Sequence, residues 1–301
     1  MSKARIYAIT DIGSNTVKCA FYEVHGEGDI RDIDFVTEKL GLIARVKDGA
    51  LPNDAISLLC DTVARYKAKA EELGAYLFKA FGTAVMRKIN NFAAVEHALY
   101  ERCGIHIHLI SGDEEARLSF EGTRMLHPEL DHGIMADMGG ASTELIAFEK
   151  DDIRAMHSFS FGCLALYKAL VKDRFPTSQE ADNIRRFVSD ELKKYDFTAS
   201  HDKLVLIGGT GKAIGKLLSR LGYSQDVNPT GVLYELASRF AAPADEDIAI
   251  LEKYVPTRVE TVMPGLIAYT AIAERAGAES VVISGGGIRD GYLKKLITED
   301  F

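Results

Sequence analysis

The sequence predicts an α/β protein built from two similar halves that face each other. Short apolar runs alternate with amphipathic helical patterns, as in chains that fold into sheets covered by helices. Many of the apolar runs end in a glycine turn. The pattern of strand, glycine turn and strand also occurs twice, and its aspartates, Asp11 and Asp137, lie close to half a chain apart. A repeat at that spacing indicates two duplicated domains.

Composition and length agree with a two-domain globular protein. The chain has 301 residues, 47% of them hydrophobic, and a formal net charge of −8. These values exclude a disordered chain, a collagen and a coiled coil, and the length favours two domains. We expect domain I at residues 1–130 and domain II at residues 131–301, with the C-terminal helix able to pack back on domain I. The acidic balance argues against a nucleic-acid partner, but a local basic pocket can still bind a polyanion.

Cysteine usage and hydropathy indicate a cytoplasmic protein without a membrane anchor. No two of the four cysteines have the spacing of metal ligands, which favours a reduced compartment. No apolar run approaches the ~20 residues of a membrane helix, and Asp11 comes too early for a signal peptide. Because closed two-fold dimers are common, we expect a homodimer.

In the first half, local patterns predict three strand regions and two helices. Strands at residues 6–9 and 17–24 flank the glycine turn and form a hairpin. Apolar residues spaced by three or four predict a helix over residues 52–73. Strands are expected at residues 75–81 and 105–110, the second followed by a helix that runs to Met125.

In the second half, the hairpin pattern recurs and is followed by further strand–helix units. Residues 133–136 and 144–148 form the second expected hairpin. A polar-faced helix is predicted over residues 180–192. Buried strands at residues 204–207 and 281–283 each run into a glycine cluster.

The two hairpin turns, residues 11–16 and 137–143, are the first candidate site. Glycines allow tight turns whose backbone N–H groups converge on an anion such as phosphate. Carboxylate oxygens suit Mg²⁺ that bridges to phosphate oxygens. The alternative is a pair of ordinary hairpin turns. The added donors would come from Ser14, Asn15, Thr16, Ser142 and Thr143, and the metal ligands from Asp11, Asp137 and Glu144.

The glycine cluster at residues 208–212 is a weaker candidate. Its glycine spacing fits neither a P-loop nor a dinucleotide-binding turn. In addition, Ala213 stands where a P-loop has its metal-binding hydroxyl. A phosphate contact by Gly209 and Thr210 at a helix N-terminus remains open.

Two charged residues complete the constellation. Ser111 and Glu114 fit a capping box, which leaves Glu115 available to deprotonate a water molecule. Arg87 follows a strand and a Gly-Thr turn, where its planar guanidinium could grip a terminal phosphate. The alternative for Arg87 is a surface salt bridge. Lys18 and Arg289 also flank glycine turns, and we expect each to be a solvated charge.

Taken in order, these segments resemble the exopolyphosphatase/guanosine pentaphosphate phosphohydrolase (Ppx/GppA) family of the actin-like ATPase and sugar-kinase superfamily. The similarity extends over residues 6–292. The matching segments are Asp11–Thr16, Gly82–Arg87, Ser111–Leu118, Asp137–Glu144, Gly208–Gly211 and Gly285–Gly291.

The resemblance implies a fold and roles for these residues. It implies two ribonuclease H-like (actin-like ATPase) domains that face each other across an interdomain cleft. It makes Glu115 the general base and Arg87 the clamp on the terminal phosphoryl group. It places Mg²⁺, or Mn²⁺, near Asp137, Gly139 and Glu144, with Ser14 and Asn15 holding phosphate from the opposite wall. Gly140 belongs to the second phosphate loop.

The expected activity is release of terminal orthophosphate from inorganic polyphosphate by metal-assisted attack of water. Guanosine pentaphosphate (pppGpp) is the alternative substrate. A kinase-like phosphotransferase is a further enzymatic alternative. A non-catalytic sensor that binds (p)ppGpp or polyphosphate is the alternative from another class, although a pure binder has no need for a base such as Glu115.

Overall fold

The computed structural model describes residues 4–26, 29–195, 202–224, 227–241 and 243–300. Its contacts divide the chain into two compact units. Unit 1 comprises Met1–Leu118 and Arg289–Phe301, and unit 2 comprises Ser119–Ile288. The boundary expected between residues 130 and 131 lies C-terminal to this one, and the C-terminal segment groups with unit 1.

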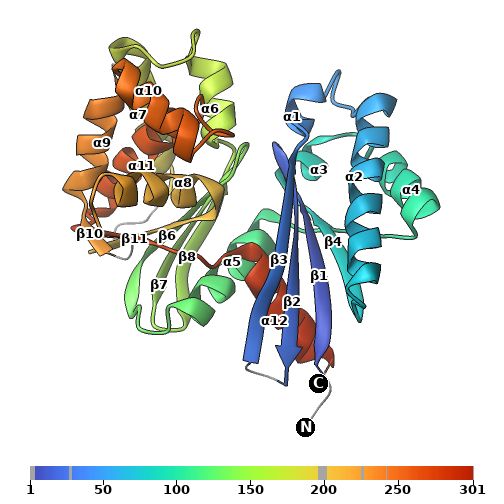
Figure 1. Cartoon of the computed structure of the whole chain (residues 1–301). Helices are drawn as coiled ribbons and strands as arrows, with labels where there is room; N and C mark the ends of the chain where they lie inside the picture. Colours follow the sequence, from blue (N-terminus) through green and yellow to red (C-terminus); the bar gives the residue numbers. More distant parts are fainter. Residues whose placement is uncertain (1–3, 27–28, 196–201, 225–226, 242, 301) are drawn as a thin grey trace. The chain divides into compact units, whose positions relative to one another are not determined.

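Unit 1 contains a five-stranded mixed sheet (Figure 1). Its strand order is β3-β2-β1-β4-β5, in which β1 pairs antiparallel with β2 and parallel with β4. The strands are β1 (Arg5–Ile12), β2 (Thr16–His25), β3 (Asp29–Lys39), β4 (Leu77–Gly82) and β5 (Ile107–Leu109).

The helices of unit 1 pack through apolar faces, of which that of α2 is an example. The long helix α2 buries eight residues along one side, among them Leu59 and Val63, because apolar residues recur every three or four positions. Glycine at 104 adopts a left-handed conformation and ends α4. The helices are α1 (Leu42–Arg45), α2 (Asn53–Glu72), α3 (Ala84–Lys88), α4 (Phe92–Cys103), α12 (Ile288–Asp300) and α5 (Gly112–Leu126), within which the unit boundary falls.

Unit 2 contains a six-stranded sheet with the order β10-β11-β9-β6-β7-β8 (Figure 1). Strand β6 pairs antiparallel with β7 and parallel with β9. The strands are β6 (His132–Met138), β7 (Thr143–Glu149), β8 (Asp152–Phe159), β9 (Lys203–Ile207), β10 (Val227–Pro229) and β11 (Ser280–Ile283).

Helix α11 is the central helix of the unit 2 core. Thirteen of its fifteen residues are buried, so it is apolar on nearly every side rather than amphipathic. Helix α7 begins at a complete capping box formed by Thr177 and Glu180. The helices are α6 (Cys163–Leu170), α7 (Ser178–Leu192), α8 (Gly208–Arg220), α9 (Gly231–Ala241), α10 (Asp245–Tyr254) and α11 (Val262–Ala276).

The two sheets share one topology, which confirms the predicted α/β class and the internal repeat. The order β3-β2-β1-β4-β5 of unit 1 corresponds to β8-β7-β6-β9-β11 of unit 2, where β10 is an addition at one edge. The strands expected from the apolar runs are all present. Strands β3 and β8 carry exposed charged residues and have no counterpart among the predicted elements. In the described part of the chain, no helix has the length and apolar character needed to cross a membrane.

Candidate functional site

The two glycine turns are equivalent in detail. Asp11 of β1 lies opposite Lys18 of β2, and Asp137 of β6 lies opposite Glu144 of β7. In the first turn the Gly13 N–H donates to the Thr16 carbonyl at 3.1 Å. In the second, the Gly139 N–H donates to the Ser142 carbonyl at 3.0 Å. The register therefore places each aspartate at the same distance from its turn, as a duplicated hairpin requires.

The carbonyls of the second turn are bound by the start of α6. Cys163 N–H donates to the Gly139 carbonyl at 3.0 Å, and Leu164 N–H donates to the Gly140 carbonyl at 3.0 Å. The N–H and C=O of a trans peptide point in opposite directions. The N–H groups of residues 140 and 141 therefore point away from α6, and successive N–H groups of this kind form an anion-binding nest.

The first turn is held in the same way by the segment that follows β3. Ile43 N–H donates to the Ser14 carbonyl, and Gly41 N–H donates to the Asn15 carbonyl, both at 2.9 Å. By the same peptide geometry the Asn15 N–H points away from α1. Each turn thus has its carbonyls bound from behind by the element that follows the third strand of its sheet.

Gly162 allows α6 to approach the second turn this closely. A Cβ atom at position 162 would lie 2.5 Å from the Gly139 oxygen and 2.7 Å from the Ala141 nitrogen. Both are backbone atoms of the turn and cannot rotate away. Glycine at 162 is therefore a condition for the geometry of the second turn.

Two buried threonines support the turns from the segments that follow the neighbouring parallel strands, Thr83 just after β4 and Thr210 in the first turn of α8. Thr83 donates its hydroxyl to the Ile12 carbonyl at 3.4 Å, and Thr210 donates to the Met138 carbonyl at 2.9 Å. Each acceptor belongs to the residue that follows the aspartate of its hairpin. The expected phosphate contact of Thr210 stays a prediction, since its hydroxyl is here part of the support of the turn.

The other residues predicted to bind phosphate differ in exposure. Ser14, Ser142 and Thr143 are buried, whereas Asn15, Thr16 and Gly140 are partly exposed. Thr143 donates its hydroxyl to the Phe161 carbonyl at 2.7 Å. Its side chain therefore fastens the base of the second turn to the segment before α6.

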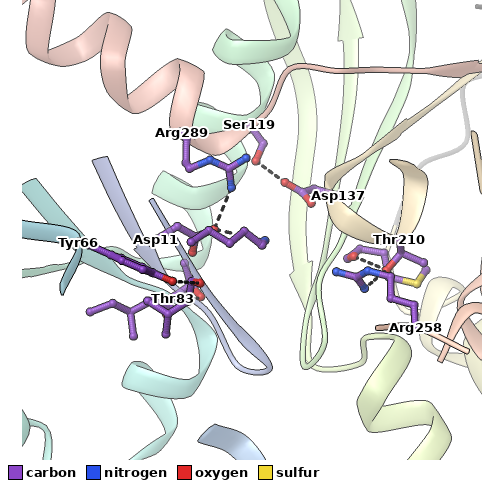
Figure 2. A network of polar contacts seen from close by, with 12 residues as sticks. Asp11, Tyr66, Thr83, Ser119, Asp137, Thr210, Arg258 and Arg289 are labelled. Carbon is purple, nitrogen blue, oxygen red and sulfur yellow. Dashed lines mark hydrogen bonds and ion pairs between the residues drawn. The ribbon is translucent and has the colours of Figure 1, made fainter. Parts of the chain in front are cut away.

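Asp137 and Glu144 are carboxylates on directly opposed residues of an antiparallel pair, so both side chains lie on one face of the sheet. Ser119 donates its hydroxyl to Asp137 Oδ2 at 2.6 Å (Figure 2), and Ser158 donates to Glu144 Oε1 at 2.7 Å. Glu144 is buried, with 1% of its surface exposed. Like charges placed opposite each other are destabilising unless a cation or donor compensates them.

These carboxylates fit a divalent cation that arrives with a phosphorylated substrate. Mg²⁺ takes hard oxygen ligands and commonly uses one or two carboxylates together with substrate phosphates. The described residues contain no group of three or more side chains that could hold a metal by themselves. A cradle for one carboxylate oxygen is also present, because a Cβ at Gly208 would lie 2.2 Å from Asp137 Oδ1.

Asp11 belongs to a compact charge network in unit 1. Its Oδ2 lies 3.5 Å from Lys18 Nζ and 3.4 Å from Arg289 Nη1 of α12 (Figure 2). Tyr22 donates its hydroxyl to Asp290 Oδ1 at 3.1 Å, and burial together with the Asp290 charge raises the pKa of Tyr22 well above its ordinary value. The expectation that Arg289 is a solvated charge is wrong, since its side chain is 15% exposed and ion-paired.

Glu115 and Arg87 form an ion pair in unit 1. Arg87 Nη1 lies 2.7 Å from Glu115 Oε2, and their side chains are 23% and 12% exposed. Arg87 also donates to the Ile110 carbonyl at 3.1 Å. Ser111 Oγ accepts the Glu114 N–H, whereas the Glu114 carboxylate pairs with Lys295 at 3.0 Å. The two side chains predicted for catalysis are therefore in direct contact, and the salt bridge of Arg87 is not a surface one.

Gly209, the second residue of helix α8, lies against Arg258. A Cβ at position 209 would lie 2.1 Å from Arg258 Nη2. Arg258 Nη1 donates to Thr210 Oγ1 at 3.4 Å (Figure 2). A cation therefore lies beside the first turn of α8, where the glycine cluster was expected to meet phosphate.

The structure brings the candidates together in two groups, one in each unit. Unit 1 holds the first turn, Asp11, Arg87 and Glu115, and unit 2 holds the second turn, Asp137, Glu144 and the start of α8. Sequence reasoning named Thr210 only as a candidate phosphate contact and did not identify the supporting role of Thr83, Thr210 or Gly162. Signals for Thr83 and Thr210 existed, because each directly follows a glycine near the end of a strand.

Comparison with known proteins agrees with this arrangement. The profile of the Ppx/GppA phosphatase family matches residues 26–299. A guanosine-5'-triphosphate,3'-diphosphate pyrophosphatase of Vibrio cholerae is 25% identical over 98% of this chain, and the counterpart from Photobacterium profundum is 23% identical. The chain spans 60% of the length of each of these relatives.

Solved structures agree on the fold. The Ppx/GppA family member of Aquifex aeolicus superimposes with a TM-score of 0.84 at 22% identity, covering 99% of both chains. An exopolyphosphatase from Cytophaga hutchinsonii superimposes with a TM-score of 0.87 at 18% identity, covering 98% of both. These likenesses confirm the predicted actin-like two-domain α/β fold. With the family profile matched over most of its length, the chain belongs to the Ppx/GppA phosphatase family.

Proposed function

We propose that this protein is an exopolyphosphatase-type phosphohydrolase that releases terminal orthophosphate from inorganic polyphosphate. The observation that carries the proposal is the pair of equivalent turns with outward-directed N–H groups, accompanied by the Glu115–Arg87 pair. The turns supply donors for a chain of phosphates, and Glu115 supplies a base. Membership of a phosphatase family is consistent with this chemistry.

The proposed mechanism uses this chain's residues for positioning and for one proton transfer. Arg87 donates N–H groups to the terminal phosphoryl oxygens, and its planar guanidinium matches their spacing. Glu115 accepts the proton of the attacking water, whose oxygen forms the new bond to phosphorus as the bridging P–O bond breaks. N–H groups of the two turns bind the remaining phosphates.

A divalent cation, Mg²⁺ or Mn²⁺, would be held by Asp137 and Glu144 near Gly139, and Asp11 is proposed to bind metal as well. When bound, it would neutralise charge on the phosphates and on the leaving oxygen. The proposal therefore requires both aspartates. Asp11→Asn and Asp137→Asn should each lower turnover, although the residues belong to different units.

The contact between Arg87 and Glu115 has a consequence for this mechanism. In the structure the guanidinium is bound to the carboxylate of the proposed base. A terminal phosphate that binds Arg87 would compete for the same N–H groups. Substrate binding would then free Glu115 at the moment when the water must be activated.

The second candidate substrate is pppGpp. It is favoured by the names of the curated relatives from Vibrio cholerae and Photobacterium profundum, which act on guanosine-5'-triphosphate,3'-diphosphate. Both substrates end in a phosphoanhydride, so the proposed chemistry is the same for either one. A sensor with this fold would bind the ligand without hydrolysing it, and a kinase would transfer phosphate to an acceptor.

A phosphate-release assay on polyphosphate, pppGpp and ATP, each with and without EDTA, distinguishes these functions. The proposal predicts EDTA-sensitive orthophosphate release that is fastest with polyphosphate. A preference for pppGpp would select the second candidate. Ligand-induced thermal stabilisation without orthophosphate release would support a sensor and refute the proposal, as would transfer of phosphate from ATP to an added acceptor.

A further inference from the structure

We propose that Ser119 is a positioning residue for Asp137, holding one carboxylate oxygen so that the other is kept for a divalent cation. The inference rests on the proposed function, in which Asp137 contributes to the metal site. Ser119 has no role in the mechanism proposed above, nor was it a candidate from the sequence. It is a buried residue of α5 whose hydroxyl faces the second hairpin.

The hydrogen bond itself is the first observation. Ser119 Oγ donates to Asp137 Oδ2 at 2.6 Å (Figure 2), the length typical of a hydroxyl bound to an ionised carboxylate. Ser119 is fully buried, so water cannot substitute for it easily. Rotation of the Asp137 carboxylate about its last bond would break this interaction.

The second observation concerns the other oxygen of Asp137. Oδ1 lies on the side of Gly208, where a Cβ would come within 2.2 Å of it. Gly208 also has a φ of +73°, a conformation that favours glycine. No side chain of residue 208 can therefore cover Oδ1, and this oxygen lies beside the first residue of α8.

The third observation is the matching support of Glu144. Ser158 donates to Glu144 Oε1 at 2.7 Å, so each of the two opposed carboxylates has one oxygen fixed by a serine hydroxyl. Hydrogen bonds of this kind orient the carboxylates that bind metals, and their loss weakens binding without removing a ligand. Two like charges with one fixed oxygen each are arranged to receive a cation.

The location of Ser119 adds to its importance. It follows Glu115 by four residues in the same helix, so the two side chains lie on one face of α5, one turn apart. The helix that carries the proposed base therefore also carries the residue that orients the proposed metal ligand.

The test compares Ser119→Ala with a matched control on the same helix. Thr123 lies one turn after Ser119 and is fully buried, and its hydroxyl has no hydrogen-bond partner among the described residues. Thr123→Val therefore removes a buried hydroxyl from α5 without touching Asp137. Three quantities are measured for both variants and for Asp137→Asn: the Mg²⁺ dependence of phosphate release, Mn²⁺ binding by EPR without substrate, and the melting temperature without metal.

The expected result is a selective loss of metal affinity. Ser119→Ala should raise the Mg²⁺ concentration for half-maximal activity and the Mn²⁺ dissociation constant by about 10- to 100-fold. At saturating Mg²⁺ its turnover should return to nearly the wild-type value, and its melting temperature should fall by only a few degrees, as the loss of one buried hydrogen bond predicts. Thr123→Val should match the wild-type protein in both metal measurements.

Two results would overturn the inference, and they have different meanings. If Asp137→Asn loses metal binding but Ser119→Ala retains wild-type metal dependence, Ser119 does not position Asp137 and the proposed function stands. If Asp137→Asn itself retains wild-type metal binding and turnover, Asp137 is not a metal residue and the metal role in the proposed function fails as well. A loss in Ser119→Ala that excess Mg²⁺ does not restore also contradicts a positioning role.

Discussion

Replacement of Gly162 by alanine should damage the second turn, because the new Cβ would collide with backbone atoms of that turn. The new Cβ would lie 2.5 Å from the Gly139 oxygen and 2.7 Å from the Ala141 nitrogen. Relief of the collision requires α6 and the turn to separate. Such a separation strains the bonds from Cys163, Leu164 and Ala165 to the turn carbonyls, which are 2.9 to 3.0 Å long.

The magnitude follows from these contacts. Overpacking costs about 1–3 kcal/mol, and each weakened hydrogen bond contributes about 0.5–1.5 kcal/mol. We expect the free energy of unfolding to fall by about 1–3 kcal/mol, which in a domain of this size lowers the melting temperature by about 2–4 °C per kcal/mol. A displacement of the turn by ~1 Å should lower kcat/KM by about 100-fold.

The assay combines thermal denaturation with initial rates of phosphate release from polyphosphate. Gly231→Ala is the matched control, because a Cβ at position 231 would meet no atom of the described residues within 4 Å. That variant should keep the stability and activity of the wild-type protein. Wild-type kcat/KM and stability in Gly162→Ala would refute the reasoning that α6 sets the geometry of this loop.

Three further predictions concern unit 1. Arg87→Ala should lower kcat/KM for phosphate release by about 100- to 1,000-fold, because the loss of one donor to a developing oxyanion costs that much. Arg87→Lys should recover only part of the lost activity. Equal rates for both variants and the wild-type protein would contradict the role of Arg87 as a phosphate clamp. Arg289→Met removes one of two cations that pair with buried Asp11 and leaves Lys18 at 3.5 Å. Urea denaturation should therefore show a loss of about 3 kcal/mol in the free energy of unfolding, the lower end for a broken buried pair. A loss below ~1 kcal/mol would indicate a minor role in stability. Burial raises the pKa of Tyr292 from 10.0 to about 12, so the folded state keeps this proton after the unfolded chain has lost it. Stability should therefore fall as the pH rises from 10 to 12, by on the order of 2–3 kcal/mol from this group, and Tyr292→Phe should show a shallower fall; parallel curves for the two proteins would exclude this contribution.

The features that were predicted from the sequence are those that depend on residues close together in the chain. The hairpins at Asp11 and Asp137 are visible because an apolar run, a glycine turn and a second run follow one another directly. The helix over residues 52–73 is visible because its buried face recurs with helical periodicity, and the structure places it at Asn53–Glu72. Local patterns of this kind survive folding with little change.

Elements whose character depends on their surroundings were missed. Strand β3 has charged residues at most positions and lies at the edge of its sheet, so neither alternation nor an apolar run marks it. Helix α11 is buried nearly all round and therefore lacks the amphipathic pattern that reveals surface helices.

Within the candidate site, the residues that carry the chemistry could be predicted, but the contacts that hold them in place could not. Glu115 and Arg87 stand out by residue type and position, yet their 2.7 Å contact depends on how α3 and α5 pack. Arg289 is 278 residues from Asp11, and only the association of α12 with unit 1 brings them together. Gly162 acts through close packing against the second turn, and Ser119 acts through a hydrogen bond to Asp137. No local sequence pattern indicates either contact.

Substitution of Glu115 by glutamine tests the central claim, that this carboxylate activates water for attack on a terminal phosphoanhydride. The change keeps the size of the side chain and removes its basicity. We predict a fall in kcat for orthophosphate release of about 100- to 10,000-fold, with binding of polyphosphate retained in a direct titration. A variant that binds polyphosphate and turns it over at the wild-type rate would contradict the account.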